Sequence, residues 1–282
     1  MRWLLLVFLS CSSNAEHLFT SEMKNGVVDC QRWNCDRCAQ LKSASGKKRI
    51  EFPLEDQGAE LALTPQGGQI LKGTYRCEIA DRHRFSPGET AWYRFRIKVP
   101  IEFQPAADKN CILAQIHDQN QLEREPKNPE LAHKPPIALR LQSSGALKVT
   151  LDLAQTALHE AQRIELVKIK NFPREQWVEF AFRIDWTNYD LPHPVAGRIQ
   201  ILYRESVNRN QNWRLLIDER RFFIGNSKWS AQGERVSWGA YLKVGPYCGD
   251  EKPKQDYKMY LSHFYRAGGL ARPFFMPELT EP

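Results

Sequence analysis

Residues 178–186 read VEFAFRIDW, and the pattern of this stretch predicts the fold class. Its apolar side chains recur at every second position, and charged or small residues stand between them. The same period of two recurs over residues 93–99, 147–153 and 199–203. Such alternation is typical of antiparallel strands that turn one face to the core and the other face to water.

Turn-forming residues separate these stretches. Most of the 17 prolines and 16 glycines fall between the alternating runs, and helical periodicity is confined to a short stretch near residues 55–63. Residues 126–136 are rich in proline and predict a long loop that walls a cleft. We find neither an internal repeat nor a linker between two globular halves. We therefore expect an all-β protein, a single antiparallel β-sandwich of jelly-roll type with a concave groove.

The chain begins with MRWLLLVFLSCSSNA, in which one cation precedes an apolar run and small residues. This order predicts a signal peptide over residues 1–15 and hence a secreted or periplasmic protein. Lipid anchoring at Cys11 is the less favoured alternative, because Phe8 and Leu9 fit that pattern poorly. No later stretch is long and apolar enough to predict a membrane span.

Six of the seven cysteines follow the predicted leader: Cys30, Cys35, Cys38, Cys77, Cys111 and Cys248. An even number in an exported chain favours disulfides over a zinc site, although the sequence does not choose among the pairings. We expect residues 16–70 to form a cysteine-bearing arm and residues 71–282 to form the jelly roll, with the arm packed on it as one structural domain.

The formal net charge of +7 points to an anionic partner, which could be a polysaccharide, a membrane surface or a nucleic acid. The cations are scattered in short clusters, without a long basic tail. A nucleic acid is the least favoured partner, because the chain carries no matching motif.

Several predicted strands carry hydrogen-bonding side chains on one face, because residues two apart in a strand share a face. Arg76 pairs in this way with Glu78, Gln115 with His117, and Tyr241 with Lys243, while Arg140 lies opposite an aliphatic face of its own strand. The same alternation predicts that Leu113 lies on one face with Gln115 and His117. It does not fix the side of Tyr247, which follows Gly245 and Pro246.

Three blocks, RCEIADR at residues 76–82, QIH at 115–117 and YLKVGPY at 241–247, resemble the signature blocks of the jelly-roll polysaccharide lyases. The sequence between them is similar to the heparin lyase and glucuronan lyase branch, and the resemblance covers roughly residues 75–265. Two departures from the alginate lyases, Ala80 in place of an arginine and Cys248-Gly249 in place of Asn-Gln, disfavour alginate.

The resemblance implies an endo-acting lyase that cleaves a uronate polymer by β-elimination and leaves unsaturated uronate ends. It implies that Gln115 and Arg76 neutralise the uronate carboxylate, that His117 and Tyr247 transfer protons, and that Lys243 favours the phenolate of Tyr247. Substrate contacts are expected from the remaining matched polar residues, namely Glu78, Arg82, Arg140 and Tyr241.

Glucuronan is the favoured substrate, followed by heparin or another glycosaminoglycan and then alginate. The His-Tyr pair does not choose the sugar, because one group suffices for elimination on glucuronate whereas guluronate and iduronate need two. The chemistry requires no cofactor. Relatives can hold a structural Ca²⁺, for which Asp118, Asp185 and Asp250 are candidates without a calcium-loop signature. We expect a monomer.

Two other classes of function compete with this reading. A non-catalytic jelly-roll module could bind anionic glycans by stacking sugars on some of the eight tryptophans. A jelly-roll glycoside hydrolase would need two carboxylates that flank the scissile bond, and no strand shows them at suitable spacing.

Overall fold

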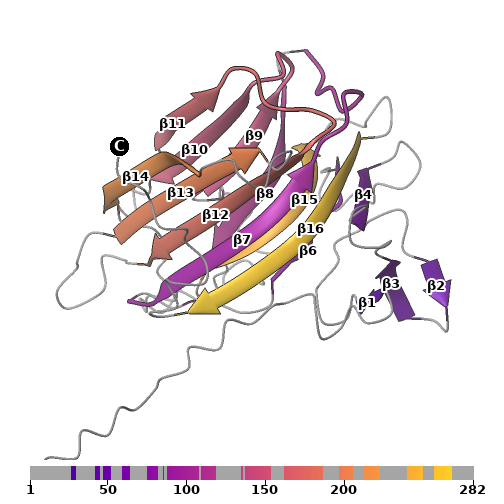
Figure 1. The fold of residues 1–282 in the computed structure, drawn as a ribbon, viewed down its shortest axis with the longest axis horizontal. Coiled ribbons are helices and arrows are strands. Elements are labelled where there is room, and N and C mark those ends of the chain that lie inside the picture. Colours follow the sequence, from indigo (N-terminus) through magenta and orange to yellow (C-terminus); the bar gives the residue numbers. More distant parts are fainter. Residues whose placement is uncertain are drawn as a thin grey trace, which may run out of the picture.

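In a computed structural model the chain is a sandwich of two large antiparallel sheets (Figure 1). The structure describes residues 27–29, 42–44, 47–51, 59–63, 75–81, 85, 88–107, 109–118, 135, 137–153, 162–186, 197–205, 213–222, 240–249 and 257–268. All regular elements within these ranges are β-strands, and every strand pair is antiparallel. The predicted all-β jelly-roll sandwich is confirmed.

The first large sheet has seven strands. Its order is β11 (Gln162–Ile169), β10 (Leu147–Leu153), β9 (Ile137–Gln142), β8 (Asn110–Asp118), β15 (Ala240–Gly249) and β5 (Tyr75–Arg76), and β6 (Ile79–Ala80) also pairs with β15. The second has six strands, in the order β14 (Arg214–Phe222), β13 (Gly197–Glu205), β12 (Trp177–Asp185), β7 (Thr90–Lys98), β16 (Tyr257–Gly268) and β4 (Ala59–Leu63).

A small third sheet is built from β1 (Val27–Asp29), β3 (Lys47–Glu51) and β2 (Lys42–Ala44). The helix expected near residues 55–63 is wrong for its second half, because residues 59–63 form β4 and pair with β16. Pairing with a neighbouring strand here overrides a weak helical pattern. The predicted signal peptide and the first three cysteines of the arm lie outside the described residues.

The core lies between the two large sheets and is filled by the alternating side chains that the sequence predicted. Phe95 packs at ring-centroid distances of 5.8 Å from Phe180 and 5.5 Å from Phe182, and all three rings are at most 1% exposed. The seven-stranded sheet contributes aliphatic residues to the same cluster, among them Leu139 and Leu242. Burial of each such side chain stabilises the fold by about 2 kcal/mol.

A buried ionic cluster also joins the two sheets. Asp81, which follows β6 and is 2% exposed, accepts hydrogen bonds from Tyr93 Oη at 3.3 Å and from Arg266 Nη1 at 2.5 Å. Tyr93 lies on β7 and Arg266 on β16, both in the opposite sheet. This cluster fixes the end of β6 and so helps to position the segment between β5 and β6.

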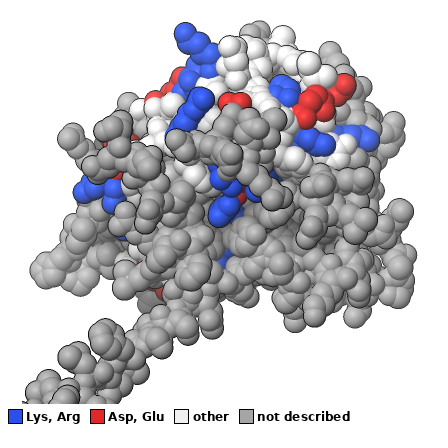
Figure 2. Space-filling view, viewed as in Figure 1, with Lys and Arg blue, Asp and Glu red and all other residues white. Residues whose placement is uncertain are grey.

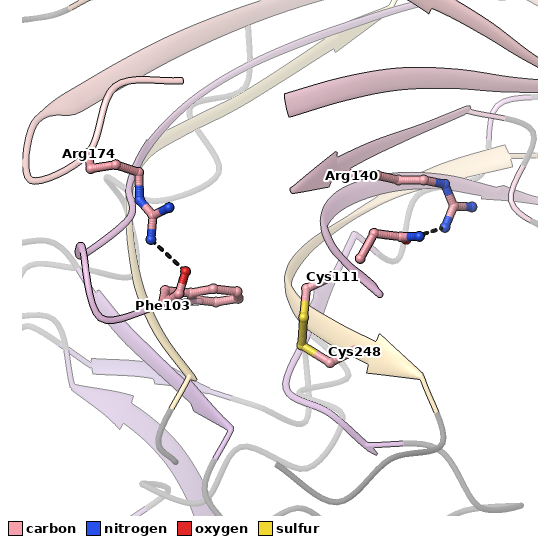
Figure 3. Close-up of a disulfide and its surroundings, with 6 residues drawn as sticks. Phe103, Cys111, Arg140, Arg174 and Cys248 are labelled. Atoms are coloured by element: carbon pink, nitrogen blue, oxygen red, sulfur yellow. Dashed lines mark hydrogen bonds between the residues drawn. A yellow bond between two sulfur atoms is a disulfide. The ribbon is translucent and has the colours of Figure 1, made fainter. Parts of the chain in front are cut away.

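A disulfide joins Cys111 of β8 to Cys248 of β15 (Figure 3). Cys77 is disulfide-bonded as well. The preference for disulfides is thus confirmed, and the structure supplies one pairing that the sequence left open. Among the described residues no helix is long and apolar enough to cross a bilayer.

Candidate active site

The strands β8 and β15 bring four of the predicted site residues onto one face of the seven-stranded sheet. Lys243 lies directly opposite Gln115, and Tyr241 lies opposite His117. The rings of Tyr241 and His117 have centroids 5.6 Å apart, and the Lys243 Nζ lies 5.5 Å from the Tyr241 centroid. This face, which points away from the core, is called the polar face below.

A β-bulge in β8 changes which residues reach the polar face. The register shifts between Ile112 and Ala114, so Leu113 is 0% exposed and belongs to the core. Ile112 instead takes a place opposite Tyr247 on one side and Arg140 on the other. The placement of Leu113 beside Gln115 was therefore wrong, because one extra residue reverses a strand's alternation.

A second irregularity, in β15, settles the position of Tyr247. The register shifts between Val244 and Tyr247, and Tyr247 comes to lie opposite Ile112 of β8 and Arg76 of β5. Arg76, Gln115, Lys243, Tyr241, His117 and Tyr247 thus all lie on β15 or on the strands paired with it. Gln115 and Lys243 stand between His117 and Tyr247 along the strands.

Gly245 is the reason that β5 and β6 can lie so close to β15. Its φ of +142° is unfavourable for other residues, and a Cβ there would stand 2.0 Å from the carbonyl oxygen of Cys77. The Cys77 N–H donates to the Pro246 carbonyl at 2.8 Å, and the Asp81 N–H donates to the Leu242 carbonyl at 2.9 Å. The glycine of the YLKVGPY block is therefore needed for the packing of the Glu78 segment.

Glu78 is a buried carboxylate behind the polar face. It is 0% exposed, accepts a hydrogen bond of 2.5 Å from Gln115 Nε2, and lies 4.0 Å from Arg76 Nη1. We expected Glu78 to contact substrate, and this contact stays a prediction, because Gln115 at 2% exposed and Lys243 at 5% are almost as buried. In the structure the Glu78 carboxylate fixes the side-chain amide of Gln115, whose Nε2 retains a second hydrogen to donate.

The phenol of Tyr247 is electrostatically different from our expectation. Burial, and next the charge of Glu78, raise the pKa of Tyr247 above its ordinary value of 10.0, while Arg76, Arg140 and Lys243 lower it by less. Lys243 does act in the expected direction, but burial outweighs it. Tyr247 is therefore a protonated phenol at neutral pH.

Arg140 extends the polar face onto β9. It is 9% exposed, and its guanidinium donates from Nε to Thr150 Oγ1 at 3.0 Å and from Nη1 to Asn110 Oδ1 at 3.2 Å. These two hydrogen bonds orient the guanidinium on the polar face. Asn110 and Thr150 were not among the predicted site residues. The signal for Thr150 was its spacing of two from Lys148, which places these two residues on one face of β10.

The Cys111–Cys248 bridge lies beside this part of the site, close to Arg140 in Figure 3. Cys248 follows Tyr247 directly, and Cys111 precedes Ile112, the residue opposite Tyr247. The bridge therefore holds the two backbones together at the step of the ladder that carries the phenol.

Some predicted residues are not placed at the site. Arg82, Asp250 and the side chain of Asp118 lie outside the described part of the chain. Asp185 belongs to the other sheet, where its carboxylate accepts hydrogen bonds from Thr90 at 2.8 Å and Arg183 at 3.1 Å. The described residues contain no group of three or more potential metal-ligating side chains.

Residues 24–264 match the family model described as polysaccharide lyase. The chain belongs to this polysaccharide lyase family. The lyase resembles in structure an alginate lyase from Klebsiella pneumoniae, with a TM-score of 0.53 at 12% identity over 86% of this chain and 99% of the other. That likeness concerns the fold alone. Among curated proteins no relative matches the chain.

Two further solved structures are similar at lower scores. An endo-β-1,4-glucuronan lyase from the fungus Trichoderma reesei gives a TM-score of 0.49 at 11% identity, with 92% of each chain covered. An alginate lyase from Aplysia kurodai gives 0.46 at 8% identity, over 91% of this chain and 97% of that one.

The packing at Gly245 gives a direct test of the site's construction. Gly245→Ala should push the Glu78 segment away from β15, lower the free energy of unfolding by several kcal/mol and reduce turnover, because the new Cβ meets backbone at 2.0 Å. Urea unfolding and kinetics measure both effects.

The matched control is Gly249→Ala in the same strand. Gly249 also has a positive φ, of +85°, but a Cβ there meets nothing within 4 Å. It should cost only about 1 kcal/mol of backbone strain. Equal losses for the two variants would contradict the close-approach argument.

Proposed function

We propose that this lyase cleaves a uronate polymer by β-elimination on the polar face. The observation that carries the proposal is the buried Glu78–Gln115 hydrogen bond, flanked by Arg76 and Lys243. It supports a site in which an amide donor and two cations stand ready for a carboxylate. Such a site suits a reaction whose intermediate carries extra negative charge on that carboxylate.

Gln115 and Arg76 would bind the carboxylate of the sugar that is cut. The proton at C5 is weakly acidic while the adjacent carboxylate is fully charged, and donors directed at the carboxylate stabilise the charge that develops when this proton leaves. Lys243, opposite Gln115, adds a further positive charge. Glu78 would act through Gln115 as a positioning residue.

On glucuronate Tyr247 alone would move the protons, whereas on guluronate or iduronate His117 would take the proton and Tyr247 would protonate the leaving oxygen. A base takes the C5 proton, its bonding electrons form the C4–C5 double bond, and the bond from C4 to the bridging oxygen breaks as that oxygen accepts a proton. A sugar bound over Gln115 and Lys243 would lie between His117 and Tyr247 along the direction of the strands. Tyr241, whose ring lies beside His117, would contact the neighbouring sugar, and Arg140 would contact an acidic group further along.

We propose glucuronan as the preferred substrate, ahead of glycosaminoglycans and alginate. The three sequence blocks, the similarity of the intervening sequence to the glucuronan branch, and the departures at Ala80 and Cys248 support this order. We further propose that the protein is exported by residues 1–15, acts as a monomer and needs no cofactor for the chemistry. A structural Ca²⁺ of the kind that relatives hold stays a prediction.

A substrate panel tests the proposed reaction. Purified protein should produce the ultraviolet absorbance of unsaturated uronate on glucuronan, and Tyr247→Phe should lower kcat by roughly 10²–10⁴-fold, the usual contribution of a general acid or base. Polymer binding should survive in this variant, because the ring remains.

The control for the panel is Tyr260→Phe on β16 of the six-stranded sheet. The ring of Tyr260 lies 4.6 Å from Lys98 Nζ of the same sheet and is not part of the proposed site. This variant should retain full turnover. Unchanged turnover of Tyr247→Phe would remove Tyr247 from the mechanism, and binding without product on every polymer would favour a non-catalytic glycan-binding protein.

The raised pKa of Tyr247 predicts the pH profile. On glucuronan one group both takes and returns the proton, so only enzyme that carries the phenolate is competent. Since that fraction grows with pH up to the raised pKa, kcat/KM should rise about tenfold per pH unit between roughly pH 7 and pH 9. A plateau on glucuronan within that range would show that Tyr247 is not the base.

A further inference from the structure

One row of cross-strand neighbours on the polar face is rich in cations. The ladder places Tyr247 opposite Arg76 and Ile112, Ile112 opposite Arg140, Arg140 opposite Lys148, and Lys148 opposite Lys168. This row, called the cation row below, therefore crosses the sheet from β5 to β11. Residues that are directly opposite share a face, so the three cations beyond Ile112 lie on the same side as the proposed site.

Three of these cations are direct cross-strand neighbours. Arg140, Lys148 and Lys168 occupy the successive strands β9, β10 and β11, and like charges directly opposite are destabilising in a sheet. Glu165 offsets part of this repulsion, since its Oε2 lies 2.5 Å from Lys148 Nζ. The Glu165 side chain is 40% exposed, so this ion pair is weak and can exchange for another anion.

On the opposite sheet, several arginines are paired with carboxylates. On the outer face of the six-stranded sheet, Glu179 accepts ion pairs from Arg94, Arg96 and Arg204, and Asp218 pairs with Arg198. Burial alone would raise the pKa of Glu179, but the three arginines hold it below its ordinary value. Figure 2 shows one face of the molecule, on which the described Lys and Arg side chains stand in several separate groups.

We propose that Arg140, Lys148 and Lys168 form consecutive subsites for acidic groups of the substrate chain, on the β11 side of the bond that is cut. The polymer then runs across the strands, and each strand that it crosses offers one cation. This inference rests on the proposed function, because the row is taken as an extension of that site. Lys148 and Lys168 gain a role in substrate binding.

The spacing of the row indicates the class of polymer. Strands lie about 4.8 Å apart, close to the advance of one 1,4-linked sugar, so the five steps from β5 to β11 span about 24 Å. Cations on three successive strands suit an acidic group on every sugar. A polymer of uronate alone meets this requirement, whereas a chain in which an uncharged sugar alternates with uronate fills only part of the row.

The experiment compares the double variant Lys148→Gln/Lys168→Gln with wild type on glucuronate oligomers of increasing length. KM should rise roughly three- to tenfold for long oligomers, the effect of losing two exposed ionic contacts, while short oligomers and kcat stay unchanged. The control is Arg220→Gln, which removes one charge from the other sheet, where Arg220 is 69% exposed. It should leave every constant at the wild-type value.

Two results would overturn the cation row as a binding site. One is an unchanged KM for long oligomers, and the other is an equal rise for short and long oligomers or for the Arg220 control. If wild type forms no unsaturated product on any polymer, the proposed reaction fails, and polyuronate binding by calorimetry then tests the row separately. Weaker binding of the double variant alone supports the row, and equal binding refutes it.

Discussion

The hydrogen bond between the buried Glu78 carboxylate and the Gln115 amide is the interaction on which the proposed site depends. A buried carboxylate is costly unless donors and cations surround it, and here Gln115 and Arg76 supply them. Burial, and next the same charge, raise the pKa of Tyr247. One buried group thus orients the amide that would bind substrate and adds to the upward shift of the phenol's pKa.

The backbone makes this arrangement possible by two departures from regular pairing. The bulge at Leu113 turns Ile112 to the polar face and leaves Gln115 and His117 there as well. Gly245 lets the Glu78 segment approach β15, and Asp81 anchors the end of that segment to the opposite sheet. The irregular positions of the seven-stranded sheet, more than its regular ones, thus place the groups of the proposed site.

Much of the fold could be predicted from the sequence, because a period of two in residues 178–186 and elsewhere fixes the core face of each strand. The bulge at Leu113 and the side of Tyr247 could not be predicted, since counting assumes an unbroken ladder. The partner of Cys111 depends on the same register. The burial of Glu78 depends on the approach at a distant glycine, which no local pattern records, so it could not be predicted from the sequence.

A crystal structure of the Tyr247→Phe variant with a glucuronate oligomer would test the proposed site without intermediate steps. One sugar carboxylate should accept hydrogen bonds from Gln115 Nε2 and Arg76, and the oligomer should cross the strands toward β11. An oligomer on the outer face of the six-stranded sheet, or a carboxylate that points away from Gln115, would refute the proposed site.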